Sequence, residues 1–66
     1  MSVAKVIEIS SISKKSFEDA IQSGISRAAK TVENIEGAWI QGQKVKVKAG
    51  KVVEYRVNMK VTFVLN

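Results

Sequence analysis

Three side chains in the second half of the chain are suited to recognising a ligand: the single tryptophan Trp39, the amide of Gln41 and the guanidinium of Arg56. An indole ring stacks on flat groups, and a guanidinium can stack on a ring or hold a phosphate through two hydrogen bonds. The chain has no histidine and no cysteine, so it lacks the usual general base, the commonest metal ligand and any disulfide. This set of residues favours binding over catalysis.

Serine and lysine are the nucleophiles that remain. The serines between residues 10 and 16 lie where a turn and a helix cap are expected, and the acidic residues form no convergent pair of carboxylates. We therefore expect that the protein is not an enzyme. The serines concerned are Ser10, Ser11, Ser13 and Ser16.

The charge balance is strongly basic. Eleven basic and six acidic residues give a formal net charge of +5 and a pI near 9.8, which suits nucleic acid, an anionic membrane or an anionic small ligand. The lysines Lys44, Lys46, Lys48 and Lys51 would suit a track of phosphates. However, the aromatic pairs of a base-stacking platform are absent from the sequence, and lysines often protect an edge strand from aggregation. A nucleic-acid or anionic-surface binding module is therefore an alternative, while neither nucleic acid nor a membrane is the expected partner.

The elements that would position these residues include a long alternating run, Val53 to Leu65. Every second residue in this run is apolar, and polar residues fill most of the places between. Because successive strand side chains point to opposite faces, the run predicts a strand with one apolar and one polar side. The polar side contains Glu54, Arg56, Asn58, Lys60 and Thr62.

A first strand and the start of a helix are indicated near the N-terminus. Val3 to Ile9 is rich in β-branched residues and predicts a strand, and Ser10 to Ser13 predicts the turn that follows. Ser16 and Asp19 form a plausible capping pair, since Ser16 can accept a hydrogen bond from the first helical turn and a carboxylate favours the positive helix end.

The helix itself is indicated by apolar and small residues that recur at spacings of three and four from Phe17 to Val32. The small residues would let the helix lie close against a sheet. We expect the helix to end between Asn34 and Gly37, where either of these two residues can adopt the left-handed cap conformation.

The second strand follows and changes its apolar side. Ala38 and Ile40 share one side of it, whereas Val45 and Val47 have the opposite parity. One extra residue flips every later side chain, so the pattern predicts a β-bulge near Gly42. The turn into the last strand is supplied by Ala49 and Gly50.

Together these elements predict an α+β fold in the order β-α-β-β, a three-stranded antiparallel sheet packed around one helix, as a single domain over residues 1–66. A chain of this length buries only about 60% of its unfolded surface, so oligomerisation is the expected source of further stability. The N-terminal segment has no long apolar run and no signal-peptide cleavage site, so we expect a cytoplasmic protein. One sheet face is left uncovered, and Trp39 on it indicates an interface or a stacking site.

Three segments of the chain resemble the dodecin family: Val3 to Ser10, Ile25 to Val32 and Tyr55 to Phe63. The resemblance covers nearly the whole chain, and the most specific matches are the Lys30-Thr31 helix end and the strand from Val57 to Phe63. It implies the β-α-β-β fold and assembly into a hollow homododecamer. It also implies a binding or storage role, because many dodecins bind flavins as stacked pairs at subunit interfaces.

The flavin site that the resemblance implies is altered in this sequence. The tryptophan that stacks on the flavin ring and the glutamine that hydrogen-bonds its polar edge correspond to Gly37 and Arg56. Trp39 lies two residues beyond Gly37, on the same strand face and about 7 Å further along. Arg56 can contact an aromatic or anionic ligand, or form an ion pair with Glu36 or Glu54 of a neighbouring subunit.

The sequence therefore predicts a homododecamer subunit that binds a small ligand or ion at subunit interfaces, with Trp39, Gln41, Arg56 and Gly37 as the ligand-binding residues. Some dodecin-like proteins bind calcium in place of flavin, so calcium is one expected ligand. The alternative is a true flavin-storage dodecin that binds FMN or riboflavin through Trp39. Calcium requires oxygen ligands, which symmetry would have to bring together from several copies of Glu8, Glu33, Glu36 and Glu54.

Overall fold

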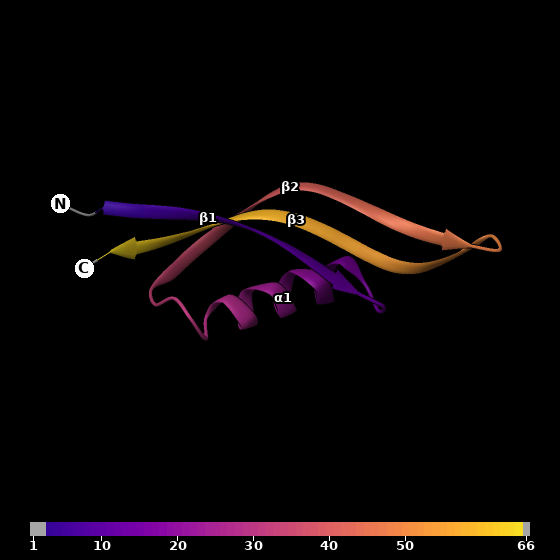
Figure 1. The fold of residues 1–66 in the computed structure, drawn as a ribbon, viewed down its shortest axis with the longest axis horizontal. Coiled ribbons are helices and arrows are strands. Elements are labelled where there is room, and N and C mark those ends of the chain that lie inside the picture. The colour runs from indigo at the N-terminus through magenta and orange to yellow at the C-terminus, as the bar shows by residue number, and fades with distance from the viewer. Residues whose placement is uncertain (1–2, 66) are drawn as a thin grey trace.

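The computed structural model describes residues 3–65 and has the predicted order of elements (Figure 1). Strand β1 spans Val3–Ser13, helix α1 spans Phe17–Ala28, strand β2 spans Ile35–Lys48 and strand β3 spans Lys51–Leu65. The strands form a three-stranded antiparallel sheet in the order β1-β3-β2, so β3 is central and β1 and β2 are the edges. The predicted α+β fold is confirmed.

Strand β1 is longer than predicted. Ser10 to Ser13, expected to form a turn, pair instead with Asn58 to Tyr55 of β3. The reason is the length of β3, which has 15 residues and offers a backbone partner to every residue of β1. The chain leaves the sheet only after Ser13, where the turn into the helix begins.

The junction between β1 and α1 is built from hydroxyl and carboxylate groups. Ser16 is the N-cap of α1, and its Oγ accepts a hydrogen bond from the backbone N–H of Asp19 at 3.0 Å, as predicted. The Asp19 carboxylate in turn accepts a hydrogen bond of 2.6 Å from the buried hydroxyl of Ser13. Ser13 Oγ also accepts from the backbone N–H of Lys15 at 2.9 Å. The helix start is thereby tied to the end of the edge strand.

Helix α1 ends at Ala28, well before the predicted end between Asn34 and Gly37. The Ala28 carbonyl accepts hydrogen bonds from the backbone N–H groups of Thr31 and Val32, both at 3.0 Å, which closes the last turn. The prediction of a longer helix was wrong because the apolar spacing continues past Ala28, although the chain there already turns back toward the sheet.

The return to the sheet depends on Asn34. Asn34 has a left-handed φ of 62°, and it is one of the two residues predicted to adopt this conformation. Its carbonyl accepts a hydrogen bond from the N–H of Val64 at 3.1 Å. The next residue, Ile35, is already paired with Phe63. This pairing fixes the start of β2 and leaves Gly37 inside the strand, not at a helix cap.

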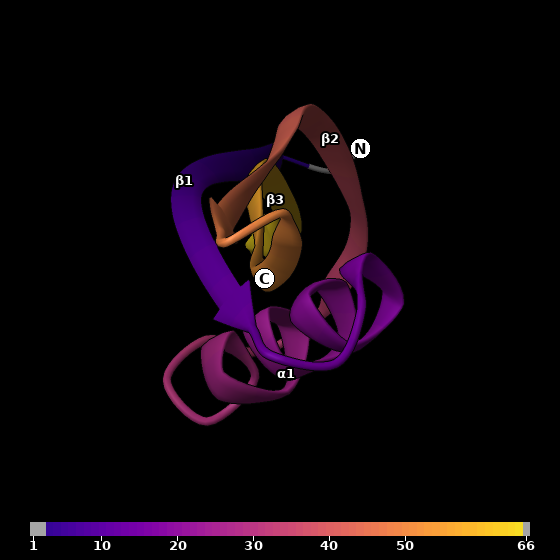
Figure 2. The same cartoon turned by 90° about the vertical axis from the view of Figure 1, so that its right-hand side faces the viewer.

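The apolar side of β3 forms the core beneath α1, and the sheet curves around the helix when viewed along its long axis (Figure 2). Val57, Met59 and Val61 of β3 are fully buried and pack with Ala20 of the helix. Phe17 at the helix start contacts Tyr55 edge-to-face, with ring centroids 5.1 Å apart. The predicted inward face of β3 is therefore the observed one.

Gly24 allows the helix to approach the sheet closely. A Cβ atom at this position would lie 2.8 Å from Met59 Cε, closer than side-chain carbons pack, and 3.1 Å from Ser11 Cβ, closer than most of them pack. The absence of a side chain at Gly24 therefore sets the distance between α1 and both β1 and β3.

The predicted bulge is present, because the register between β2 and β3 shifts between Ile40 and Gly42. Two further shifts were not predicted. One lies between Ile35 and Gly37, and the other lies opposite Lys46 and Val47, where a residue of β3 is passed over. All three irregularities fall on the β2–β3 pairing, and the β1–β3 register is continuous from Val3 to Ser13.

The β2–β3 hairpin extends well past the start of the helix and forms an arm (Figure 1). A helix of 12 residues is about 18 Å long, whereas a strand of 15 residues reaches about 50 Å, so one helix cannot cover the hairpin. At its tip, Ala49 and Gly50 have φ values of 51° and 76°, the geometry of a two-residue type I′ turn. We call residues 44–56 the hairpin arm.

Candidate functional site

The sheet face opposite the helix carries all four predicted ligand-binding residues. We call it the outer face, and it comprises the polar side of β3 with the residues beside it on β1 and β2. Directly opposed residues of neighbouring strands share a face, and we call each such set of opposed residues across the sheet a row. The strand register fixes the order of these rows along β3. No described residue of helix α1 lies on this side of the sheet (Figure 2).

Gly37 and Trp39 occupy successive rows of the outer face. Gly37 is opposite Thr62 and Trp39 is opposite Lys60, so the bulge before Gly37 leaves the two residues on the same face. The Trp39 side chain is 69% exposed, the highest value among the large hydrophobic residues described. An indole exposed on an open sheet face is available to stack on a ring or to pack against another protein surface.

Gln41 lies at the bulge between Ile40 and Gly42. Together with Glu8, Ser10 and Asn58 it lines a shallow hollow of about 310 Å³ on the outer face. Hydroxyl and amide groups therefore converge one row from Trp39, and the Glu8 carboxylate adjoins them from the row of Trp39 itself. Sequence reasoning identified Gln41 but missed Ser10 and Asn58, because only the β1–β3 register shows that these two residues are directly paired.

Arg56 lies further along the same face, between Ile12 of β1 and Lys44 of β2. Its position on β3 is four residues from that of Lys60, the partner of Trp39, which corresponds to about 13 Å. Within one chain, Arg56 and Trp39 therefore flank the hollow and do not meet.

Arg56 forms an ion pair inside its own chain. Its Nη2 atom lies 3.5 Å from Oε2 of Glu54, two residues away on the same strand face. This Glu54 oxygen is covered from solvent but has no hydrogen-bond partner among residues 3–65. One carboxylate oxygen on the outer face is thus desolvated and only weakly compensated.

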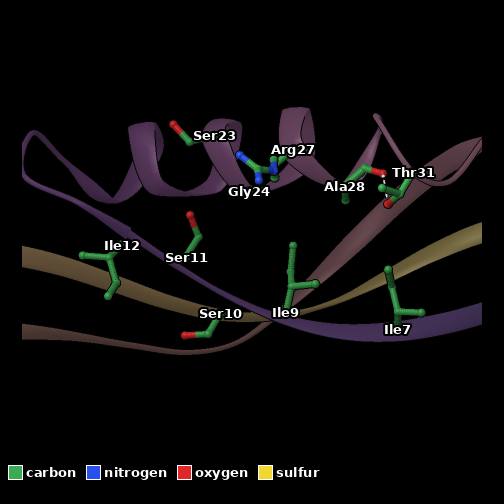
Figure 3. Close-up of a pocket in the computed structure, with 10 residues that line it drawn as sticks. All are labelled: Ile7, Ile9, Ser10, Ser11, Ile12, Ser23, Gly24, Arg27, Ala28 and Thr31. Atoms are coloured by element: carbon green, nitrogen blue, oxygen red, sulfur yellow. Dashed lines mark hydrogen bonds between the residues drawn. The ribbon is translucent and has the colours of Figure 1, made fainter.

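A second concave region lies on the other side of the sheet. The groove between β1 and α1 has a volume of about 460 Å³ and is mostly apolar (Figure 3). Ile7 and Ile9 rise toward the helix from β1, Arg27 belongs to the helix, and Thr31 lies just past the helix end (Figure 3). The sequence feature that indicates this groove is Gly24, because the lack of a side chain there leaves space beside the helix.

Metal-binding capacity is limited within one chain. Residues 3–65 contain no group of three or more histidine, cysteine, aspartate or glutamate side chains close enough to hold an ion. The carboxylates expected to bind calcium are therefore dispersed, and any complete oxygen shell would require several copies of the chain. No helix within the described range is long and apolar enough to cross a membrane.

The fold and the outer face define a class of small β-α-β-β proteins, in which a single helix covers one face of a curved sheet and the opposite face is left open. The family model described as dodecin matches residues 3–66. The chain belongs to the dodecin family, as the sequence segments indicated.

The similar proteins agree with this assignment. The calcium dodecin of Mycobacterium tuberculosis is 35% identical over 63 residues, covering 96% of this chain and 89% of that protein. Its crystal structure, described as having a calcium-binding site, superposes with a TM-score of 0.83 at 35% identity and covers 98% of this chain and 93% of the other. A variant of the Thermus thermophilus dodecin superposes with a TM-score of 0.94 at 29% identity, covering 100% and 98% of the two chains. The Streptomyces davaonensis dodecin reaches 0.92 at 28% identity, covering 98% and 96%.

Proposed function

We propose that this chain is the subunit of a hollow homododecamer that binds or stores a small ligand or ion at subunit interfaces. The observation that carries the proposal is the uncovered outer face, on which Trp39 is 69% exposed beside a hollow lined by polar groups. Trp39, Gln41, Arg56 and Gly37 are its proposed ligand-binding residues. The proposal includes a single domain over residues 1–66, a cytoplasmic location and no catalytic role.

Assembly is supported by the apolar surface that one chain leaves exposed. Val6, Ile12 and Trp39 on the outer face are each at least half exposed, and so is Val47 on the arm. Both edge strands also carry unpaired backbone groups, which favour contact with another chain. A partner of the same sequence would bury both features.

Calcium is the first proposed ligand. Gly37 and Arg56 replace the tryptophan and glutamine implied for flavin, and the similar Mycobacterium tuberculosis protein is a calcium dodecin. The covered oxygen of Glu54 that accepts no hydrogen bond is one atom that a hard cation would satisfy. Arg56, 3.5 Å from this oxygen, already neutralises part of the negative charge of Glu54. Carboxylates from neighbouring copies would therefore have to complete the coordination shell of the calcium ion. The proposed set is Glu8, Glu33, Glu36 and Glu54.

Flavin is the second proposed ligand, and the exposed indole of Trp39 favours it. Stacked on this indole, the isoalloxazine ring of FMN or riboflavin would lie one row from the amides of Gln41 and Asn58. These amides can donate to and accept from the polar edge of such a ring. In this arrangement the flavin would bind two residues further along β2 than at Gly37, the position that corresponds to the family's stacking tryptophan.

The assembly is tested by native mass spectrometry together with light scattering at micromolar concentration. We expect a twelve-subunit mass, as the family resemblance implies. A monomer under these conditions would contradict the proposal, whatever its ligand.

The ligand is tested by elemental analysis of the purified protein, calorimetric titration with calcium and fluorescence titration with FMN and riboflavin. Retained calcium and saturable heat would support the first ligand, while quenching of flavin fluorescence that is lost in Trp39→Ala would support the second. Lys14→Ala, at an exposed site outside the outer face, is the matched control for both titrations. Failure of both titrations would remove calcium and flavin while leaving the assembly result intact.

A further inference from the structure

The positive charge of the protein is concentrated in the hairpin arm. Residues 44–56 contain five of the eleven basic residues and one of the six acidic residues, so they carry four of the five net positive charges. Every residue from 41 to 52 is exposed. The tip of the arm lies beyond the start of the helix (Figure 1).

Strand register gathers these cations on one face of the arm. Lys44 is directly opposite Arg56, and Lys48 is directly opposite Lys51. Lys46, between them on β2, is opposite Glu54, whose carboxylate is already paired with Arg56 at 3.5 Å. Like charges directly opposite each other destabilise a sheet. Two such pairs on one short hairpin are therefore unfavourable until an anion lies between them.

Protection of an edge strand does not explain this arrangement completely. Lysines on β2 alone would prevent strand addition at that edge. Arg56, however, lies on β3 where both sides of that strand are paired, with Ile12 and with Lys44. A cation at this central position adds nothing to edge protection and increases the local positive potential.

We propose that the cationic face of the hairpin arm binds a nucleic-acid strand through its phosphates. Lys44, Lys46 and Lys48 recur every second residue along β2, at about 7 Å intervals, which is comparable with the separation of neighbouring phosphates. Contacts of this kind are electrostatic and carry no base sequence information. Lys44, Lys46 and Lys48 are not among the proposed ligand-binding residues, and only Arg56 belongs to both the arm and the ligand site.

An anionic bilayer is the less suitable polyanion. The arm's apolar residues Val45 and Val47 alternate with the lysines, so they lie on the opposite face. A bilayer surface that contacted the lysines would gain no apolar burial from these valines. A flexible phosphate chain needs only the cationic face.

The test uses a fluorescein-labelled single-stranded DNA of about eight nucleotides, which suits one arm, and fluorescence anisotropy from about 50 to about 200 mM salt. Four phosphate contacts predict a slope of log affinity against log salt of about −3. The triple variant Lys44→Gln, Lys46→Gln and Lys48→Gln should bind at least about 10-fold more weakly at the lower salt, with a slope near −1.

The matched control removes the same charge elsewhere. Lys14→Gln, Lys15→Gln and Lys30→Gln change three exposed lysines outside the arm, and this variant should retain the wild-type slope. Equal loss in both variants, no binding to the oligonucleotide, or binding that does not weaken with salt would each overturn the proposal. Tighter binding to phosphatidylserine vesicles than to DNA would overturn it in favour of a membrane.

A measurement on the wild-type protein covers the case in which the arm variant does not fold. Bound oligonucleotide should protect Lys44, Lys46 and Lys48 from acetylation, read by mass spectrometry, and should leave Lys14 and Lys15 reactive. Uniform acetylation of all five lysines with DNA present would contradict binding by the arm.

Discussion

The hydroxyl of Ser13 links the end of β1 to the start of the helix, because it donates to Asp19 and accepts from the backbone of Lys15. Replacing Ser13 with alanine would leave the backbone N–H of Lys15 and a carboxylate oxygen of Asp19 without their partner. We expect Ser13→Ala to lower the free energy of unfolding by about 1–3 kcal/mol, measured as a lower urea midpoint with an unchanged slope.

The control for this prediction is Ser10→Ala, which changes an exposed hydroxyl on the same strand. Its effect should stay within about 0.5 kcal/mol. Equal destabilisation by both variants would show that the loss comes from the serine type and not from the junction.

Ala49 adopts a left-handed conformation that asparagine tolerates better than alanine. Ala49→Asn creates the Asn-Gly pair favoured in type I′ turns, and we expect it to raise the free energy of unfolding by about 0.5–1 kcal/mol. Gly50→Ala, at a φ of 76°, should have the opposite sign. Thermal denaturation of the two variants at one protein concentration checks both, and a loss of stability in Ala49→Asn would contradict the turn assignment.

For single residues, the sequence predicted which face of the sheet a side chain lies on but not which side chains lie beside it. Trp39 was correctly assigned to the open face, because alternation alone fixes the side of a strand. An ion pair of Arg56 with Glu36 or Glu54 of a neighbouring subunit was one of two expected roles and stays a prediction, whereas the pair with Glu54 of the same chain was not foreseen. Ser10 and Asn58 were missed because their proximity depends on how β1 aligns with β3, a long-range property that no local pattern encodes.

The helix and the sheet approach each other at Gly24, where an added Cβ would clash with Met59 and Ser11. Gly24→Val would push α1 away from the strands, and we expect a loss of about 1–3 kcal/mol in unfolding free energy. Ser26→Val, on the exposed side of the same helix, introduces the same β-branched side chain without the clash. Urea denaturation of both should show a much smaller loss for Ser26→Val, and equal losses would show that a side chain at position 24 causes no clash with the strands.

The elements themselves were largely predictable, with two instructive exceptions. The bulge near Gly42 was predicted because the apolar residues on its two sides have opposite parity. The shift near Val47 was not, because Val52 and Val53 are both apolar and hide the change of face. Helix α1 was predicted too long because the apolar spacing continues to Val32, whereas the pairing of Ile35 with Phe63 requires an earlier end.

The whole molecule depends on a small core for its length. The fully buried residues described are Ala20, Val57, Met59 and Val61, while large apolar side chains remain exposed on both the outer face and the arm. Since assembly would bury this surface, we expect the urea midpoint to rise with protein concentration over roughly a hundredfold range. A midpoint independent of concentration would show that the single chain is stable without partners.

The three register shifts between β2 and β3 divide the hairpin into segments of different local stability. A bulge interrupts the ladder of hydrogen bonds, whereas the β1–β3 register continues from Val3 to Ser13. Backbone amides of the arm should therefore exchange with deuterium sooner than those of β3 between Val57 and Phe63, which pair on both sides. The shift at Lys46 and Val47, which lies within the arm, marks where the hairpin can open while the sheet beneath the helix stays closed.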